Sequence, residues 1–168
     1  LELDPSPQPL SNLRFDRPLL GSVLHNVRSA NVKHPYIGSL GTSVGPQHRH
    51  RYDIVIGNPP WSTWSATKEV PAKAVAAQVR EVEAVIRPIV RDRLGEAAEK
   101  RFTMLDKVPD VPFLWRAMDW ARPGGRIAFV VHGRFLFKQS ETGQRSRSDL
   151  MHAATFTGIL NGAAVRQS

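Results

Sequence analysis

The 168-residue sequence contains no cysteine, which excludes disulfide bonds and thiolate metal sites and fits a reducing compartment. It has no apolar run as long as a membrane span, and its N-terminus lacks the basic and apolar regions of a signal peptide. We therefore expect a cytoplasmic protein without membrane contact. The chain begins with Leu1 rather than methionine, which predicts that it is cut from a longer polypeptide.

The composition indicates one globular domain with a basic surface. Hydrophobic residues make up 41% of the chain, which is typical of a folded protein and not of a disordered one. The 23 Lys and Arg residues outnumber the 15 Asp and Glu residues, giving a formal net charge of +8. Such a charge attracts polyanions, so nucleic acid is a candidate partner.

Strand-like and helix-like segments alternate along the chain. We predict strands at 1–4, 19–27, 36–40, 53–57 and 126–131, and helices at 72–94 and 112–121. Pro88 should kink the first helix or open a second one, and 122–125 should end the helix before it. This alternation favours a mostly parallel sheet with flanking helices, whose strand ends at 2–4, 58–61 and 132–135 point to one rim.

The turn that follows the strand at 53–57 carries an unusual set of groups. Asn58 precedes Pro59 and Pro60, which have no N–H and restrict the backbone, and Trp61 adds an aromatic plate. The turn is therefore rigid and presents oxygen acceptors. Two such acceptors beside a plate suit a planar ring with an exocyclic NH2, whose nitrogen becomes more nucleophilic when both N–H bonds are held.

These residues resemble the catalytic motif of S-adenosylmethionine-dependent N6-adenine DNA methyltransferases of restriction–modification systems. Further stretches resemble the same family: 2–5, the acidic end of its second strand; 123–131, its fifth strand; and 137–143 and 158–162, which resemble downstream parts of its larger members. The resemblance implies a bacterial protein with a class I methyltransferase fold. It also implies S-adenosyl-L-methionine as cofactor and duplex DNA with a flipped adenine as partner.

The resemblance also implies roles for single residues. In the catalytic motif, formed by Asn58, Pro59, Pro60 and Trp61, the amide of Asn58 and the carbonyl of Pro59 hold the N6 amine while Trp61 stacks on the base. By the same resemblance Glu2 binds the ribose of the cofactor, with Asp4 as the second choice. Ser39 contacts the adenine of the cofactor, at a position where the family usually has aspartate.

Two departures from the family pattern bear on completeness. No glycine-rich F-x-G-x-G loop precedes 2–4, and His132 stands where the family commonly has proline. We therefore expect 1–168 to form a partial catalytic domain, an incomplete class I (Rossmann-like) α/β sheet without its first strand and glycine-rich loop. We expect it to be inactive alone, and the rest of a larger restriction–modification polypeptide or its subunits to be partners.

Four cations follow the fifth strand on the side where DNA would lie: Arg134, Lys138, Arg145 and Arg147. They are candidates for phosphate contact, with a plain solvated face as the alternative. Phe135 is interpreted as a core residue. The basic loop 48–51 lacks carboxylates or cysteines at ligand spacing, so we predict no metal site.

Other functions remain open. Similar Asn-Pro-Pro-aromatic motifs serve methyltransferases that act on protein glutamine or on an RNA guanine amine. A third possibility, from another class, is a basic nucleic-acid-binding module that keeps the fold without the chemistry.

Overall fold

The structure is a computed structural model that describes residues 38–42, 46–68 and 70–160. The strands predicted at 1–4 and 19–27, and with them Glu2 and Asp4, lie outside the described residues. The elements are η2 (Gly38–Leu40), η3 (Pro46–His48), β1 (Tyr52–Gly57), α2 (Ala72–Leu94), α3 (Glu96–Arg101), η4 (Leu105–Lys107), α4 (Asp110–Trp120), β2 (Ala121–Phe129), α5 (Arg134–Phe137) and α6 (Glu141–Ala153).

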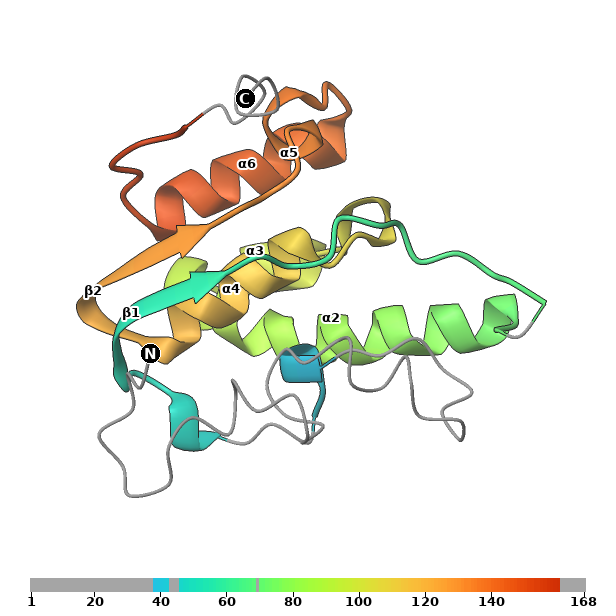
Figure 1. Ribbon diagram of the computed structural model, residues 1–168, viewed down its shortest axis with the longest axis horizontal. Helices are drawn as coiled ribbons and strands as arrows, with labels where there is room; N and C mark the ends of the chain where they lie inside the picture. The colour runs from blue at the N-terminus through green and yellow to red at the C-terminus, as the bar shows by residue number, and fades with distance from the viewer. Residues whose placement is uncertain (1–37, 43–45, 69, 161–168) are drawn as a thin grey trace, which may run out of the picture.

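The two strands of the described residues pair in parallel, as the alternating pattern predicts (Figure 1). α4 runs into β2 and contacts both strands, α2 packs against α4, and α6 contacts α2. The chain is thus an α/β fold with a small parallel sheet and flanking helices. No helix in the described ranges has the length and apolar character needed to cross a membrane.

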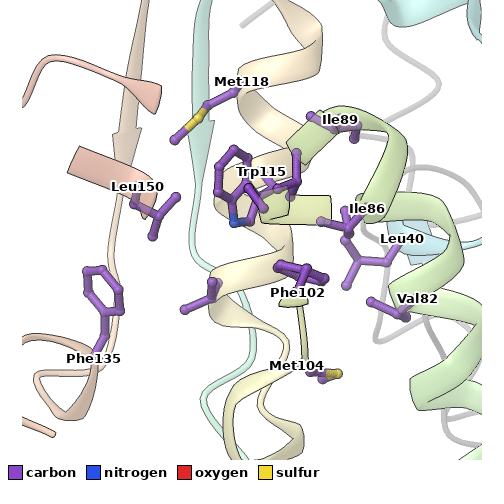
Figure 2. Packing of buried hydrophobic residues seen from close by; sticks show 13 residues of the cluster. Leu40, Val82, Ile86, Ile89, Phe102, Met104, Trp115, Met118, Phe135 and Leu150 are labelled. Carbon is purple, nitrogen blue, oxygen red and sulfur yellow. The ribbon is translucent and has the colours of Figure 1, made fainter. Parts of the chain in front are cut away.

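The core lies between the helices and one face of the sheet. Trp115 of α4 is its largest fully buried side chain; it lies near Ile86 and Ile89 of α2 and meets the ring of Phe102 edge to face (Figure 2). Truncating a buried tryptophan typically costs about 3–5 kcal/mol. The helix predicted at 72–94 is confirmed as α2. Along it Val75, Val82, Ile86 and Ile89 are buried and Val79 is half-buried.

The other face of the sheet is apolar and exposed. Val55 and Ile127 point toward the helices, whereas Ile54 and Ile56 alternate with them and are 46% and 69% exposed. Successive side chains along a strand point to opposite faces of the sheet, so Val55 faces the core while its neighbours Ile54 and Ile56 face outward. Parallel sheets are normally covered on both faces, and among the described residues this face has no such cover.

One local prediction was wrong, and two other segments need comment. Residues 38–40 form the 3-10 turn η2 instead of a strand, because glycines at 38 and 41 favour a turn, and that turn delivers Leu40 into the core. Of the two outcomes expected for Pro88, a kink or the start of a second helix, the second does not occur, because Pro88 lies inside the single helix α2. The segment after Lys138 contains α6, for which no helix was predicted; the helix is capped by the Ser140 hydroxyl, which accepts from the Gly143 N–H.

The stretch 122–125 does end α4, but it belongs to β2 as an irregularity in the ladder. The register passes from the pair Tyr52↔Ala121 directly to Ile54↔Arg126, so the residues between Ala121 and Arg126 bulge out of the sheet. Gly124 has φ +77°, a backbone conformation that only glycine adopts without strain. The strand predicted at 126–131 therefore starts its regular pairing where expected and ends at Phe129.

Gly57 gives the first testable consequence. A Cβ at this position would lie 2.6 Å from Cζ of the Phe129 ring, so Gly57→Ala should lower the free energy of unfolding by about 1–3 kcal/mol through overpacking. Urea unfolding measures this change. Gly158→Ala is the matched control because nothing lies within 4 Å of its added Cβ. If both variants have the same free energy of unfolding, the ring of Phe129 does not pack on Gly57. If Gly57→Ala is the less stable variant, adding Phe129→Leu should restore part of the lost free energy of unfolding.

Candidate functional site

The residues that follow β1 form what we call the acceptor turn, Asn58 to Trp61. Asn58 is exposed, Pro59 is buried and Pro60 is half-buried, so the turn is anchored in its middle and open at its ends. Among the described residues, the side-chain amide of Asn58 has no hydrogen-bond partner. Its oxygen and N–H groups are thus free for a ligand.

Residues that follow β2 make three contacts with Trp61. The indole N–H of Trp61 donates to the carbonyl of Val130 at 3.2 Å, and Nη2 of Arg134 donates to the carbonyl of Trp61 at 2.9 Å. The rings of Trp61 and His132 meet edge to face, with centroids 6.3 Å apart. Trp61 as a whole remains 39% exposed, which leaves a surface on which a planar ring can stack.

Two of the three predicted strand ends therefore meet at one rim, as expected. The backbone N–H of Val130 donates to the carbonyl of Gly57 at 3.0 Å, which carries the pairing of the strands up to the acceptor turn. We call residues 130–134 the β2 rim. The third predicted strand end, with Glu2 and Asp4, lies outside the described residues.

A buried carboxyl group behind this rim was not anticipated from the sequence. Asp110, the first residue of α4, is 4% exposed, and its Oδ1 accepts from the N–H of Val111 at 2.8 Å. Burial raises the pKa of Asp110 above its usual range, against the hydrogen bond from Val111 and the charges of Arg134 and His132. An aspartate between two prolines at a helix start is the signal that sequence reasoning could have used.

The four cations predicted to contact DNA all have partners inside the protein. Arg134 holds Trp61, and the ammonium of Lys138 pairs with the carboxylate of Asp106. Arg145 pairs with Glu141 one turn earlier in α6, and Arg147 donates to the carbonyls of Phe135 at 3.2 Å and Lys138 at 2.6 Å. Their role toward DNA stays a prediction, and each would have to share or leave a partner to reach a phosphate.

Ser39, predicted to meet the adenine of the cofactor, is 3% exposed on η2. Its backbone carbonyl accepts from Nε of the buried Arg116 at 3.0 Å, so the residue joins η2 to α4. This placement leaves little surface for a cofactor ring, and no other described residue stands out for that part. A role of Ser39 toward the cofactor stays a prediction.

Two smaller interpretations can be compared with the structure. Phe135 is 2% exposed in the main core, which confirms its reading as a core residue, whereas Phe137, which sequence reasoning passed over, is 74% exposed on α5. His48 packs in an aromatic cluster with Tyr52 and Trp120, so part of the basic loop faces inward. In the described part of the chain, no three His, Cys, Asp or Glu side chains come together as metal ligands would.

Comparison with known proteins gives one match. A family model described as Eco57I restriction-modification methylase matches residues 25–164. The matched segment includes the acceptor turn, the β2 rim, Ser39 and the four cations, and it excludes Glu2 and Asp4. No curated protein and no solved structure matches the chain.

Asp110 gives a prediction about pH. Burial disfavours the ionised form of the Asp110 carboxyl and raises its pKa, so Asp110→Asn, which is neutral and keeps an acceptor for Val111, should raise the free energy of unfolding at about pH 7. Because the native pKa is raised, the folded wild type binds protons more readily than the unfolded chain and loses stability as pH rises through that pKa. The advantage of the variant should therefore shrink toward about pH 4.

Urea unfolding at both pH values checks this expectation. Glu96→Gln, at an exposed position of α3, is the control and should change the free energy of unfolding little at either pH. If Asp110→Asn is less stable than the wild type at about pH 7, the attraction of Arg134 and His132 outweighs the cost of burial.

Proposed function

Because the chain belongs to the Eco57I restriction-modification methylase family, we propose that this methyltransferase acts on the N6 amine of an adenine that has left the DNA helix. S-adenosyl-L-methionine is the donor that the family implies, and it supplies an electrophilic methyl group on a sulfonium. The proposed catalytic residues are Asn58, Pro59, Pro60 and Trp61. The observation that carries the proposal is the unpartnered, exposed amide of Asn58 beside a fixed and partly exposed indole.

The acceptor turn fits an aromatic amine better than it fits an alcohol or a carboxylate. The Asn58 amide oxygen and the Pro59 carbonyl are two acceptors on a backbone stiffened by consecutive prolines. An NH2 group can donate to both, which draws its lone pair out of conjugation and stabilises the positive charge that develops as the nitrogen gains a methyl group. The excess proton then leaves to water, so no strong base is needed at the site.

Trp61 supplies the second part of recognition. Its indole N–H is taken by Val130, so the ring is fixed in orientation while part of its face stays open. Stacking of a base on such a ring is worth roughly 1–3 kcal/mol. An adenine inside duplex DNA has its amine buried in the stack, so the base must first rotate out of the helix to reach the turn.

The family supports DNA as the acceptor over the two alternatives in methyl transfer, protein glutamine and RNA guanine. The net charge of +8 is consistent with a polyanionic partner. We propose phosphate contact for Arg145, on the exposed face of α6, more readily than for Arg147, whose guanidinium holds two backbone carbonyls. Glu2 and Asp4 stay proposals for the cofactor ribose.

Substitution of Asn58 tests the function. In the full-length protein, Asn58→Ala should lower the rate of methyl incorporation from labelled S-adenosylmethionine into long unmethylated duplex DNA by about 10²- to 10³-fold, because one preorganised partner of the amine is lost. Asn58→Asp keeps an oxygen acceptor and should lose less. Mass spectrometry of the digested DNA should identify the product as N6-methyladenine.

Cofactor affinity and a matched variant complete the test. Binding of S-adenosylmethionine should be nearly the same in Asn58→Ala and wild type, and Thr142→Ala, at an exposed position of α6, should leave the rate unchanged. A rate that survives Asn58→Ala, or a methyl group found on guanine or protein, would refute the proposal. Equal loss of rate and cofactor affinity would show that the turn has a structural role instead.

A further inference from the structure

Arg134 makes a contact within the protein that a role in binding DNA phosphates does not explain. It is the first residue of α5, and its Nη2 donates a charge-assisted hydrogen bond to the carbonyl of Trp61 at 2.9 Å. That carbonyl closes the acceptor turn. Because Pro59 and Pro60 leave the backbone between Asn58 and Trp61 little freedom, a fixed Trp61 carbonyl also restricts where the Asn58 amide can lie.

The contacts around Trp61 form a closed set within one short segment. Val130 accepts the indole N–H, His132 packs against the ring, and Nδ1 of His132 accepts the backbone N–H of Arg134 at 3.0 Å. The β2 rim thus holds Trp61 by side chain and by main chain at once. Of these contacts, only the one from Arg134 acts on the backbone of the turn.

The short helix α5, which carries Arg134, is itself held by contacts with other elements. At the other end of α5, Lys138 pairs with Asp106, and Arg147 of α6 donates to the carbonyls of Phe135 and Lys138. Behind the rim lies the buried carboxylate of Asp110, whose charge attracts that of Arg134. Arg134 is therefore a donor of defined position, and moving it to a phosphate would release the turn.

We propose that Arg134 is a positioning residue of the methyl transfer, which holds the acceptor turn in its reactive geometry through the Trp61 carbonyl, and is not a phosphate contact. This inference rests on the proposed function. Transfer to a weak nucleophile depends on alignment, and a displacement of about 1 Å can cost on the order of 10²-fold in rate. A loosened turn should therefore slow the chemical step more than it weakens DNA binding.

The first test is kinetic and uses the full-length protein. Arg134→Met removes the donor and keeps the chain length; it should lower kcat by about 10- to 10²-fold while KM for DNA changes little. Arg134→Lys should restore part of kcat, because an ammonium can still donate to the carbonyl. Arg80→Met, at an exposed position of α2, is the matched loss of one positive charge and should leave kcat unchanged.

Salt dependence separates positioning from phosphate contact. If Arg134 binds a phosphate, Arg134→Met should reduce the slope of log affinity against log salt by about 1 and raise KM at unchanged kcat. If Arg134 positions the turn, the slope should stay that of the wild type. The first pattern would overturn the proposal.

A second readout does not require activity. In the 168-residue chain labelled with ¹⁵N, the indole signal of Trp61, assigned through Trp61→Phe, should show a lower heteronuclear NOE in Arg134→Met than in wild type. The signal of the buried Trp115 should not change, which controls for global loosening. An unchanged Trp61 signal would overturn the positioning role.

The two readouts also separate this inference from the proposed function. If the wild type makes no N6-methyladenine, the proposed function fails, and the NOE still reports whether Arg134 fixes the turn. If the wild type is active and Arg134→Met keeps the kcat of the wild type, only the positioning role fails.

Discussion

Parallel strands end at the same edge of a sheet, and in this protein the pairing of β1 with β2 brings the acceptor turn and the β2 rim together. The turn after β1 carries the amide and the indole, and the segment after β2 carries the groups that hold them. These segments are about seventy residues apart in sequence, and the backbone bond from Val130 to Gly57 joins them directly below the turn. Without that pairing neither Val130 nor Arg134 would lie near Trp61.

The pairing depends in turn on the helical layer beneath it. A two-stranded sheet is at best marginally stable alone in water. Here Val55 packs on Trp120 and Ile127 on the main core, so α4 supports both strands from the same side. Trp115, one turn and a half before the end of α4, links this support to α2 and Phe102. The rigidity of the acceptor turn therefore depends on a core that is built mostly of residues far from the turn.

Sequence reasoning located the parts of this structure that have strong local signals. The short β-branched strand at 53–57, the helix at 72–94 and the breaker at 122–125 are encoded by neighbouring residues, and each is found where expected. It failed where tertiary packing decides the conformation, as at 38–40, where burial of Leu40 outweighs weak strand propensity. Packing also decides the outcome at Pro88, because the burial of Ile86 and Ile89 on either side stabilises a single helix through it.

The site shows the same division. The acceptor turn is recognisable from four consecutive residues. The contacts that hold Trp61 and the burial of the Asp110 carboxyl depend instead on segments that are distant in the sequence. The basic residues after β2 illustrate why charge alone is a poor guide. A cation in a sequence looks equally free whether it faces solvent or, as Arg134 and Lys138 do, holds a carbonyl or carboxylate of its own chain.

The bulge between Ala121 and Arg126 has a consequence for how such a chain can change during evolution. The strand leaves the ladder after Ala121 and re-enters in register at Arg126, so the connection between α4 and the rim contains slack. A residue gained or lost in that stretch would alter only the size of the bulge. The same event between Phe129 and Arg134 would shift His132 and Arg134 along the chain relative to Trp61 and separate Trp61 from these partners. Insertions and deletions among relatives should therefore accumulate in the bulge and be absent from the rim.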